Sequence, residues 1–142
     1  MGKLFSEYSI PIDSVYSSQW CRCKETARLA FGNFESLSAL NSTFSADYQK
    51  NHSKQMSELY QFIKNWDDSQ GNLIFVTHYV IVGGFLDYYP SSGEMVITDK
   101  SLSVLGTIKI NFQKNTLSIN QYKPIIEIII EIGICKNALY QL

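Results

Sequence analysis

The stretch Leu73-Ile74-Phe75-Val76-Thr77-His78 decides the expected fold of this chain. Its apolar residues follow one another without polar alternation, which is typical of a parallel strand buried on both faces of a sheet. Ligands of such sheets collect at the carboxyl ends of the strands. A histidine in that place is a candidate for binding or catalysis, so we expect His78 to lie at the functional edge of the sheet.

A second strand end precedes it in the sequence. Asp13–Ser18 is predicted to be a short strand, and Trp20–Phe31 is predicted to be a helix that stops at Gly32-Asn33. Arg22 then falls in the first helical turn, where unpaired backbone N–H groups carry a partial positive charge. An arginine there can hold a phosphate through two parallel hydrogen bonds, so Arg22 is a candidate anion-binding residue.

The other expected elements complete an α/β pattern. The region Glu35–His52 is polar and is predicted to be mostly loop. We expect a three-layer α/β/α sandwich built on a mostly parallel, mixed sheet. Helices are predicted at Lys3–Tyr8, Lys54–Trp66 and Tyr79–Tyr88, and strands at Met95–Thr98 and Val104–Ile110.

Composition narrows the class of protein. The chain has 142 residues and a net charge of -1, which fits a single soluble domain and argues against nucleic acid as a partner. The apolar run Ile125–Ile134 is about half the ~20 residues of a membrane helix, so no transmembrane segment is expected. No signal peptide is recognised within this sequence, and the compartment and oligomeric state stay open. The pair Cys21-x-Cys23 is too tight for a zinc knuckle, so no metal is expected.

Three motifs in order resemble the histidine phosphatase superfamily, whose fold is phosphoglycerate mutase-like. They are Ser17-Ser18-Gln19-Trp20-Cys21-Arg22-Cys23-Lys24-Glu25-Thr26-Ala27, the strand end at His78, and Ser92-Gly93-Glu94-Met95-Val96. The resemblance covers about Lys3–Ile110. It implies a partial histidine phosphatase domain at 1–112 and an extension of unknown role at 113–142.

The resemblance also implies a chemistry. Family members hydrolyse a phosphomonoester or phosphoanhydride through a phosphohistidine, by covalent catalysis and electrostatic positioning without metal or cofactor. Arg22 is similar to the second phosphate-binding arginine of the family, and His78 to its second histidine. The general acid is not assigned by any motif. Glu94 is its best candidate, because it opens a strand at the site edge, ahead of Asp47 and Glu35.

One segment of the family pattern is absent from this sequence. No Arg-His-Gly occurs, and the histidines are His52 and His78. His52 lies at no expected strand end, so it is a poor substitute for the nucleophile. We expect a chain truncated at its N-terminus, inactive as written, whose sheet lacks its first, central strand. The isoleucine-rich segment Ile125–Ile132 could fill that position, pair with another chain or aggregate.

Two other functions are compatible with these residues. The first is a non-catalytic phosphate-binding or interaction module that keeps Arg22 and His78. The second is a serine hydrolase that uses Ser17 or Ser18, which the lack of a Gly-x-Ser-x-Gly elbow disfavours.

Overall fold

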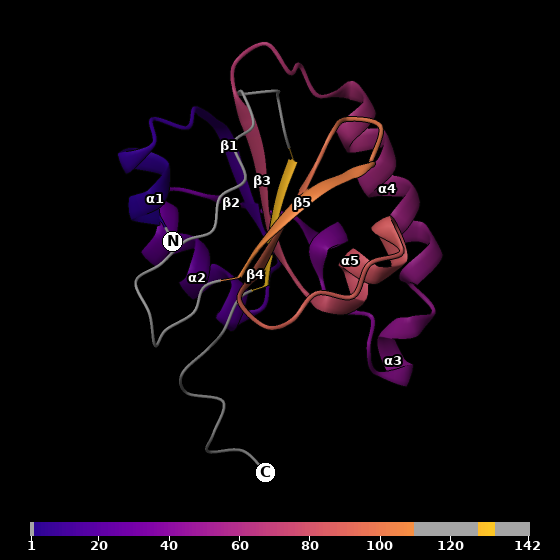
Figure 1. The fold of residues 1–142 in the computed structure, drawn as a ribbon. Helices are drawn as coiled ribbons and strands as arrows, with labels where there is room; N and C mark the ends of the chain where they lie inside the picture. Colours follow the sequence, from indigo (N-terminus) through magenta and orange to yellow (C-terminus); the bar gives the residue numbers. More distant parts are fainter. Residues whose placement is uncertain (1, 110–127, 133–142) are drawn as a thin grey trace.

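The computed structural model describes residues 2–109 and 128–132. The fold is mixed α/β, as predicted (Figure 1). Within the described residues, no helix is both long and apolar enough to cross a membrane. The elements are α1 (Gly2–Glu7), β1 (Ile12–Ser17), α2 (Cys21–Phe31), β2 (Glu35–Ser36), the 3₁₀ helix η1 (Ser38–Leu40), α3 (Ala46–Gln49), α4 (His52–Asn65), β3 (Asn72–Thr77), α5 (Tyr79–Leu86), β4 (Glu94–Thr98), β5 (Val104–Lys109) and β6 (Ile128–Ile132).

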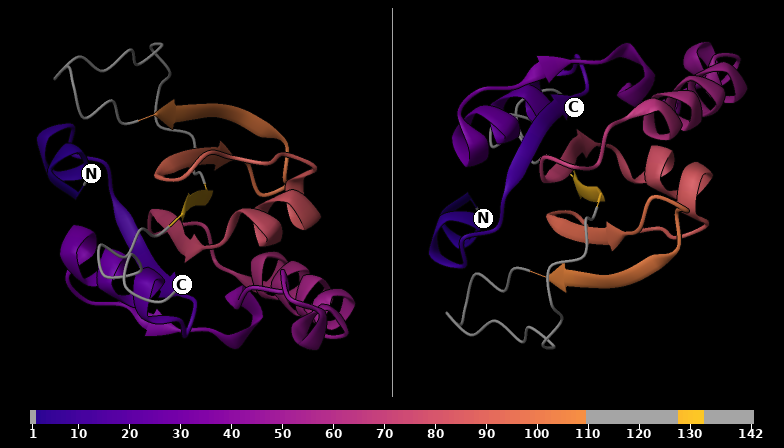
Figure 2. Two further views of the ribbon diagram at one scale, coloured as in Figure 1. Left: turned by 90° about the horizontal axis from the view of Figure 1, so that it is seen from below. Right: turned by 90° about the horizontal axis from the view of Figure 1, so that it is seen from above.

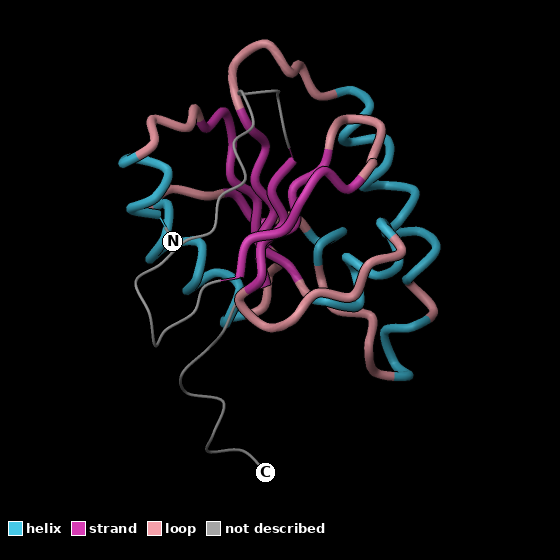
Figure 3. Tube along the Cα trace, in the orientation of Figure 1, coloured by secondary structure: helices cyan, strands magenta, loops and turns pink. Residues whose placement is uncertain are grey.

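The strands form one sheet in the order β2-β1-β3-β6-β4-β5. β1 runs parallel to β2 and β3, and β6 runs parallel to β3, whereas β4 is antiparallel to both β6 and β5. Figure 3 shows the strands gathered at the centre with helices to either side. In the β1–β3 register, Ser17 stands beside Val76. The residues that follow these two strands therefore emerge at the same edge of the sheet.

The position between β3 and β4, where we expected a missing strand, is occupied by β6. Leu73 pairs with Ile128 and Thr77 with Ile132 on one side, while Met95 pairs with Glu131 on the other. The isoleucine-rich segment therefore fills the central position of the sheet, which was the first of its three alternatives. An unpaired buried backbone group costs about 1–3 kcal/mol, so pairing with β6 stabilises the facing edges of β3 and β4. The rest of the predicted extension at 113–142 lies outside the described residues.

Helices cover both faces of the sheet. Figures 1 and 2 show α1 and α2 on one side of the strands and α4 and α5 on the other. Each side has its own apolar core. The core beneath α1 and α2 contains Phe5, Val15, Cys23, Ala27, Ile74, Val76 and Met95. The core beneath α4, α5 and η1 contains Ala39, Leu40, Leu59, Ile63, Leu73, Phe75, Ile81, Val82 and Val96.

Glycines determine the end of α2 and the close packing of α5. Gly32 follows α2 with a φ of 81°, a conformation that glycine adopts without strain, and its N–H donates to the Arg28 carbonyl at 3.0 Å. Gly83 and Gly84 let α5 approach its neighbours closely. A Cβ at Gly83 would lie 2.1 Å from the Tyr89 ring, and one at Gly84 would lie 2.5 Å from the His52 ring.

The segment predicted as loop, Glu35–His52, is more ordered than expected. It contains β2, η1 and α3, and α4 begins at His52 rather than at Lys54. Tertiary hydrogen bonds hold it against α4. Gln55 Nε2 donates to the carbonyls of Ala39 and Asn41 at 3.1 and 2.8 Å.

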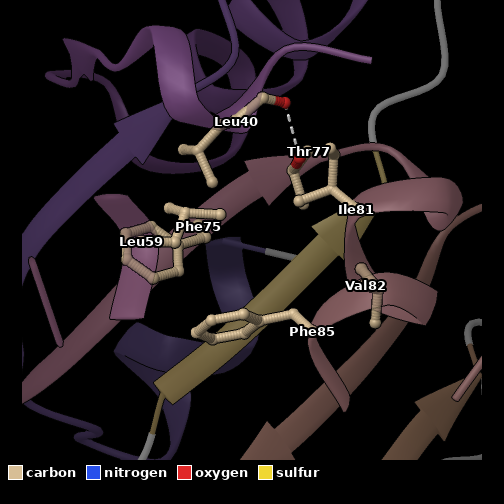
Figure 4. Close-up of a pocket in the computed structure, with 7 residues that line it drawn as sticks. All are labelled: Leu40, Leu59, Phe75, Thr77, Ile81, Val82 and Phe85. Atoms are coloured by element: carbon tan, nitrogen blue, oxygen red, sulfur yellow. Dashed lines mark hydrogen bonds between the residues drawn. The ribbon is translucent and has the colours of Figure 1, made fainter. Parts of the chain in front are cut away.

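A small apolar pocket lies beneath this segment, beside the end of β3 (Figure 4). Thr77 Oγ1 donates to the Leu40 carbonyl at 2.7 Å there. The cavity volume is about 10 Å³, room for roughly one water molecule. This pocket is therefore a packing gap and not a substrate site. It is lined by Leu40, Leu59, Phe75, Thr77, Ile81, Val82 and Phe85.

Candidate functional site

The ends of β1 and β3 bring two short polar segments together. Ser18 follows β1 and donates its backbone N–H to the Val76 carbonyl at 2.9 Å. His78 follows β3 directly and caps the start of α5. Both side chains are buried at the sheet edge, with only 3% of His78 exposed. This edge holds the candidate site.

Arg22 reaches the same place from the first turn of α2. Its Nη2 atom lies 3.0 Å from Nδ1 of His78, although 56 residues separate the two in the sequence. The guanidinium also lies over the Trp20 ring, with Cζ 5.3 Å from the ring centroid. Trp20 in turn meets the His78 ring edge-to-face at 5.2 Å. The two side chains singled out from the sequence are thus in direct contact.

The hydrogen bonds at His78 fix the position of its proton. A guanidinium only donates, so Nδ1 of His78 accepts from Arg22. In a neutral imidazole the other nitrogen then carries the hydrogen, and Nε2 donates to Ser18 Oγ at 3.0 Å. Ser18 Oγ passes its own hydrogen to Asn41 Oδ1 at 3.1 Å. The four side chains form one directed chain of hydrogen bonds.

Asn41 ties this chain to the protein backbone. Its Oδ1 also accepts the backbone N–H of Gln19 at 2.8 Å, and its Nδ2 donates to Gln19 Oε1 at 2.8 Å. The amide is therefore held in one orientation, which in turn fixes the Ser18 hydroxyl. Sequence reasoning missed Asn41, since it lies in the polar segment and 23 residues from its partner.

Burial and charge keep His78 neutral. Desolvation by burial, followed by the positive charge of Arg22, lowers the pKa of His78 to about 4. The imidazole is uncharged near pH 7, in agreement with the single ring proton on Nε2. Among the described residues, no carboxylate forms an ion pair with Arg22. An anion at this place would offset the charge of the guanidinium beside the neutral imidazole.

Glu94 lies at the same edge of the sheet, across β6 from Thr77, as the register of β4 requires. Its buried carboxylate accepts the Tyr88 hydroxyl at 2.6 Å and the Ser91 N–H at 2.8 Å, and Lys109 Nζ is 3.7 Å away. Burial alone would raise the pKa of Glu94, but these bonds and the lysine charge together lower it. Such a carboxylate is ionised near neutrality. A role as general acid, which needs a bound proton, stays a prediction that this environment does not favour.

The remaining sequence candidates lie apart from the pair. His52 opens α4, and its Nδ1 is 2.8 Å from Thr43 Oγ1. Asp47 is exposed in the first turn of α3, and Glu35 is exposed on β2. Among the described residues, no three His, Cys, Asp or Glu side chains gather closely enough to hold a metal ion.

Comparison with known proteins gives one short match to a curated protein and no family. No family model matches the chain, and no solved structure matches it. The N-acetyl-gamma-glutamyl-phosphate reductase of Halalkalibacterium halodurans is 36% identical over 67 residues, which make up 46% of this chain. The chain spans about a fifth of that reductase, 19% of its length. So short a match assigns no family.

Proposed function

We propose that this chain carries the phosphate-binding half of a histidine phosphatase site and binds the phosphoryl group of a phosphomonoester or phosphoanhydride. The 3.0 Å contact between Arg22 and His78 at the carboxyl edge of the sheet carries the proposal. Arginine at a helix N-terminus is suited to phosphate, because its planar fork and the nearby backbone N–H groups donate to the same oxygens.

The fold supports the proposal through the order of its parts. In a phosphoglycerate mutase-like sandwich, the two phosphate-binding side chains follow neighbouring strands, and helices cover both faces of a mixed sheet. Here β1 and β3 are adjacent and parallel. The segment with Ser18 and Arg22 follows β1, and His78 follows β3. We therefore propose the finer fold class, a three-layer phosphoglycerate mutase-like sandwich, together with the site.

In the proposed complex, Arg22 binds the phosphoryl oxygens and His78 stabilises their charge. An entering anion takes over hydrogen bonds from the guanidinium that His78 Nδ1 now accepts. The released nitrogen can then bind a proton, and the imidazolium would add a second positive charge to the site. Ser18 and Asn41 act as positioning residues, because they hold Nε2 of His78 in place.

Turnover by the 142 residues alone is not part of the proposal. The family's phosphohistidine requires an Arg-His-Gly segment that this sequence does not contain. His52 opens α4 and follows no strand, and its ring contacts Thr43 and Gly84, so it does not take the place of that segment's histidine. We therefore expect phosphate binding without hydrolysis, which is the non-catalytic alternative for a chain of this family.

The contact between Ser18 and His78 invites comparison with a serine hydrolase, but the bond runs in the wrong direction. Nε2 donates to Ser18 Oγ, and a general base must accept there. Nδ1 faces a guanidinium, whereas a hydrolase places a carboxylate at that position. With a pKa lowered to about 4, His78 is also a weak base. Phosphate binding is the better account of the same residues.

Calorimetric titration with inorganic phosphate tests the proposal. Replacing Arg22 by methionine removes charged hydrogen bonds worth about 1.5–3 kcal/mol, so affinity should fall by roughly ten- to a hundredfold. Arg28→Met is the matched control, because Arg28 lies on the same helix but pairs with Glu25 in solvent. Equal loss in both variants, or no phosphate binding by the native chain, would refute the proposal.

An assay with 4-nitrophenyl phosphate separates binding from catalysis. We expect no release of 4-nitrophenol by the 142-residue chain at any pH from 5 to 8. Release that disappears in a His78→Ala variant would show instead that the chain is an active phosphatase.

A further inference from the structure

Exposed aromatic side chains lie on the segments next to the Arg22–His78 pair. Seven aromatic residues of the described chain are largely exposed, and four of them lie on the segments that flank this pair. We call these four the aromatic rim: Trp20 at 37%, Phe44 at 72%, Tyr48 at 47% and Tyr79 at 42% exposed. Single scattered exposed aromatics are ordinary, whereas several on neighbouring segments beside a candidate binding site indicate an interaction surface.

The rim consists of two pairs of rings, each formed between segments that are distant in the sequence. Trp20 meets Tyr48 edge-to-face with centroids 6.0 Å apart, and Phe44 meets Tyr79 at 6.1 Å. These four rings come from the β1–α2 turn, the loop before α3, α3 itself and the start of α5. The segment between Asn41 and Tyr48 is anchored at both ends, through the bond of Asn41 to Ser18 and the contact of Tyr48 with Trp20.

Trp20 joins the rim to the Arg22–His78 pair. The Trp20 centroid lies 5.3 Å from Cζ of Arg22 and 5.2 Å from the His78 ring centroid. A phosphoryl group on Arg22 and His78 would therefore place its ester oxygen next to an indole. The group attached to that oxygen would meet aromatic surface at once.

We propose that the Arg22–His78 pair and the aromatic rim together bind an aryl phosphate monoester, with the phosphoryl group on the pair and the aromatic ring against Trp20 and Tyr48. The inference rests on the phosphate site of the proposed function and adds the class of ester. Aromatic rings pair with one another beyond simple burial of area, in offset or edge-to-face geometry. A ring bonded directly to the ester oxygen reaches Trp20, whereas a nucleobase is held further away by its ribose.

Methyl phosphate and phenyl phosphate provide a matched pair of probes, because they carry the same phosphoryl group. We expect the full chain to bind phenyl phosphate about tenfold more tightly than methyl phosphate, as one or two aromatic contacts predict. A Phe44→Ala/Tyr48→Ala double variant should lower this ratio to about twofold. Both side chains are exposed, so their removal leaves the core intact. Tyr60→Ala, an exposed tyrosine on α4, is the control and should keep the ratio at tenfold.

The outcomes separate the two proposals. Equal affinities for both probes, each lost in Arg22→Met, would overturn the aryl inference and leave the phosphate site standing. Binding of adenosine 5′-monophosphate more than tenfold tighter than phenyl phosphate would overturn it too, in favour of a nucleotide. Failure to bind either probe or inorganic phosphate would overturn the phosphate site and the inference with it.

Discussion

Protonation of His78 should destabilise the folded chain as the pH falls. The pKa of the buried imidazole is lowered to about 4 from an ordinary value of 6.5. Between these values the unfolded chain binds a proton that the folded chain does not, so the free energy of unfolding decreases as the pH is lowered. Above pH 6.5 the effect is absent. At 1.36 kcal/mol per pH unit, His78 should remove about 2 kcal/mol between pH 7 and 5, and about 3 kcal/mol by pH 4.

Urea unfolding at pH 7 and pH 5 measures this effect. In a His78→Gln variant the loss of about 2 kcal/mol should disappear, whatever the variant's stability at pH 7. Carboxyl groups whose pKa is lowered in the fold, such as Glu94 and Asp99, titrate below this window. The difference between the two proteins in this pH-dependent loss of free energy is therefore the contribution of His78.

The charge of Arg22 contributes part of the shift, after burial. Arg22→Met should return the pKa of His78 part of the way to 6.5 and reduce the pH dependence, while Arg28→Met should leave it unchanged. If native protein and His78→Gln lose the same free energy between pH 7 and 5, the imidazole is not buried beside a guanidinium and the reasoning fails.

Three further changes test the packing around the site. Thr98 Oγ1 is buried without a hydrogen-bond partner among the described residues, so Thr98→Val should raise the free energy of unfolding by about 1 kcal/mol in urea titrations; a loss of stability would contradict this. Gly84→Ala would press a methyl group on the His52 ring and should cost about 1–3 kcal/mol, seen as a lower Tm, and an unchanged Tm would refute the close packing. Ile130→Pro removes a backbone donor from β6, which pairs with Phe75, and should cost about 3 kcal/mol more than Ile130→Ala; equal costs would show that β6 is not in the sheet.

The sequence predicts the elements that have a strong local pattern. The apolar run before His78 is the buried strand β3, and the glycine after Phe31 ends α2. Both depend on neighbouring residues alone. The meeting of Arg22 and His78 depends on strand pairing, yet it could be expected from their places after two strands, because parallel strands present their carboxyl ends at one edge.

Features set by tertiary contact were not predictable in the same way. The polar segment before α4 has no hydrophobic period, and its order depends on bonds such as that from Gln55 to the Asn41 carbonyl. Asn41 reaches Ser18 only in the folded chain. The isoleucine-rich segment left three alternatives open, since the same pattern suits a strand that fills the central position, pairing with another chain or aggregation. Its pairing with β3 and β4 decides between them.

The most direct test follows the ring of His78 by ¹⁵N NMR at pH 7 while inorganic phosphate is added. If Arg22 and His78 bind one anion between them, the Nδ1 and Nε2 signals should shift in a saturable way. The shift should vanish in Arg22→Met and persist in Arg28→Met. Ring signals that stay fixed up to tens of millimolar phosphate, or that shift equally in both variants, would contradict a shared phosphate site.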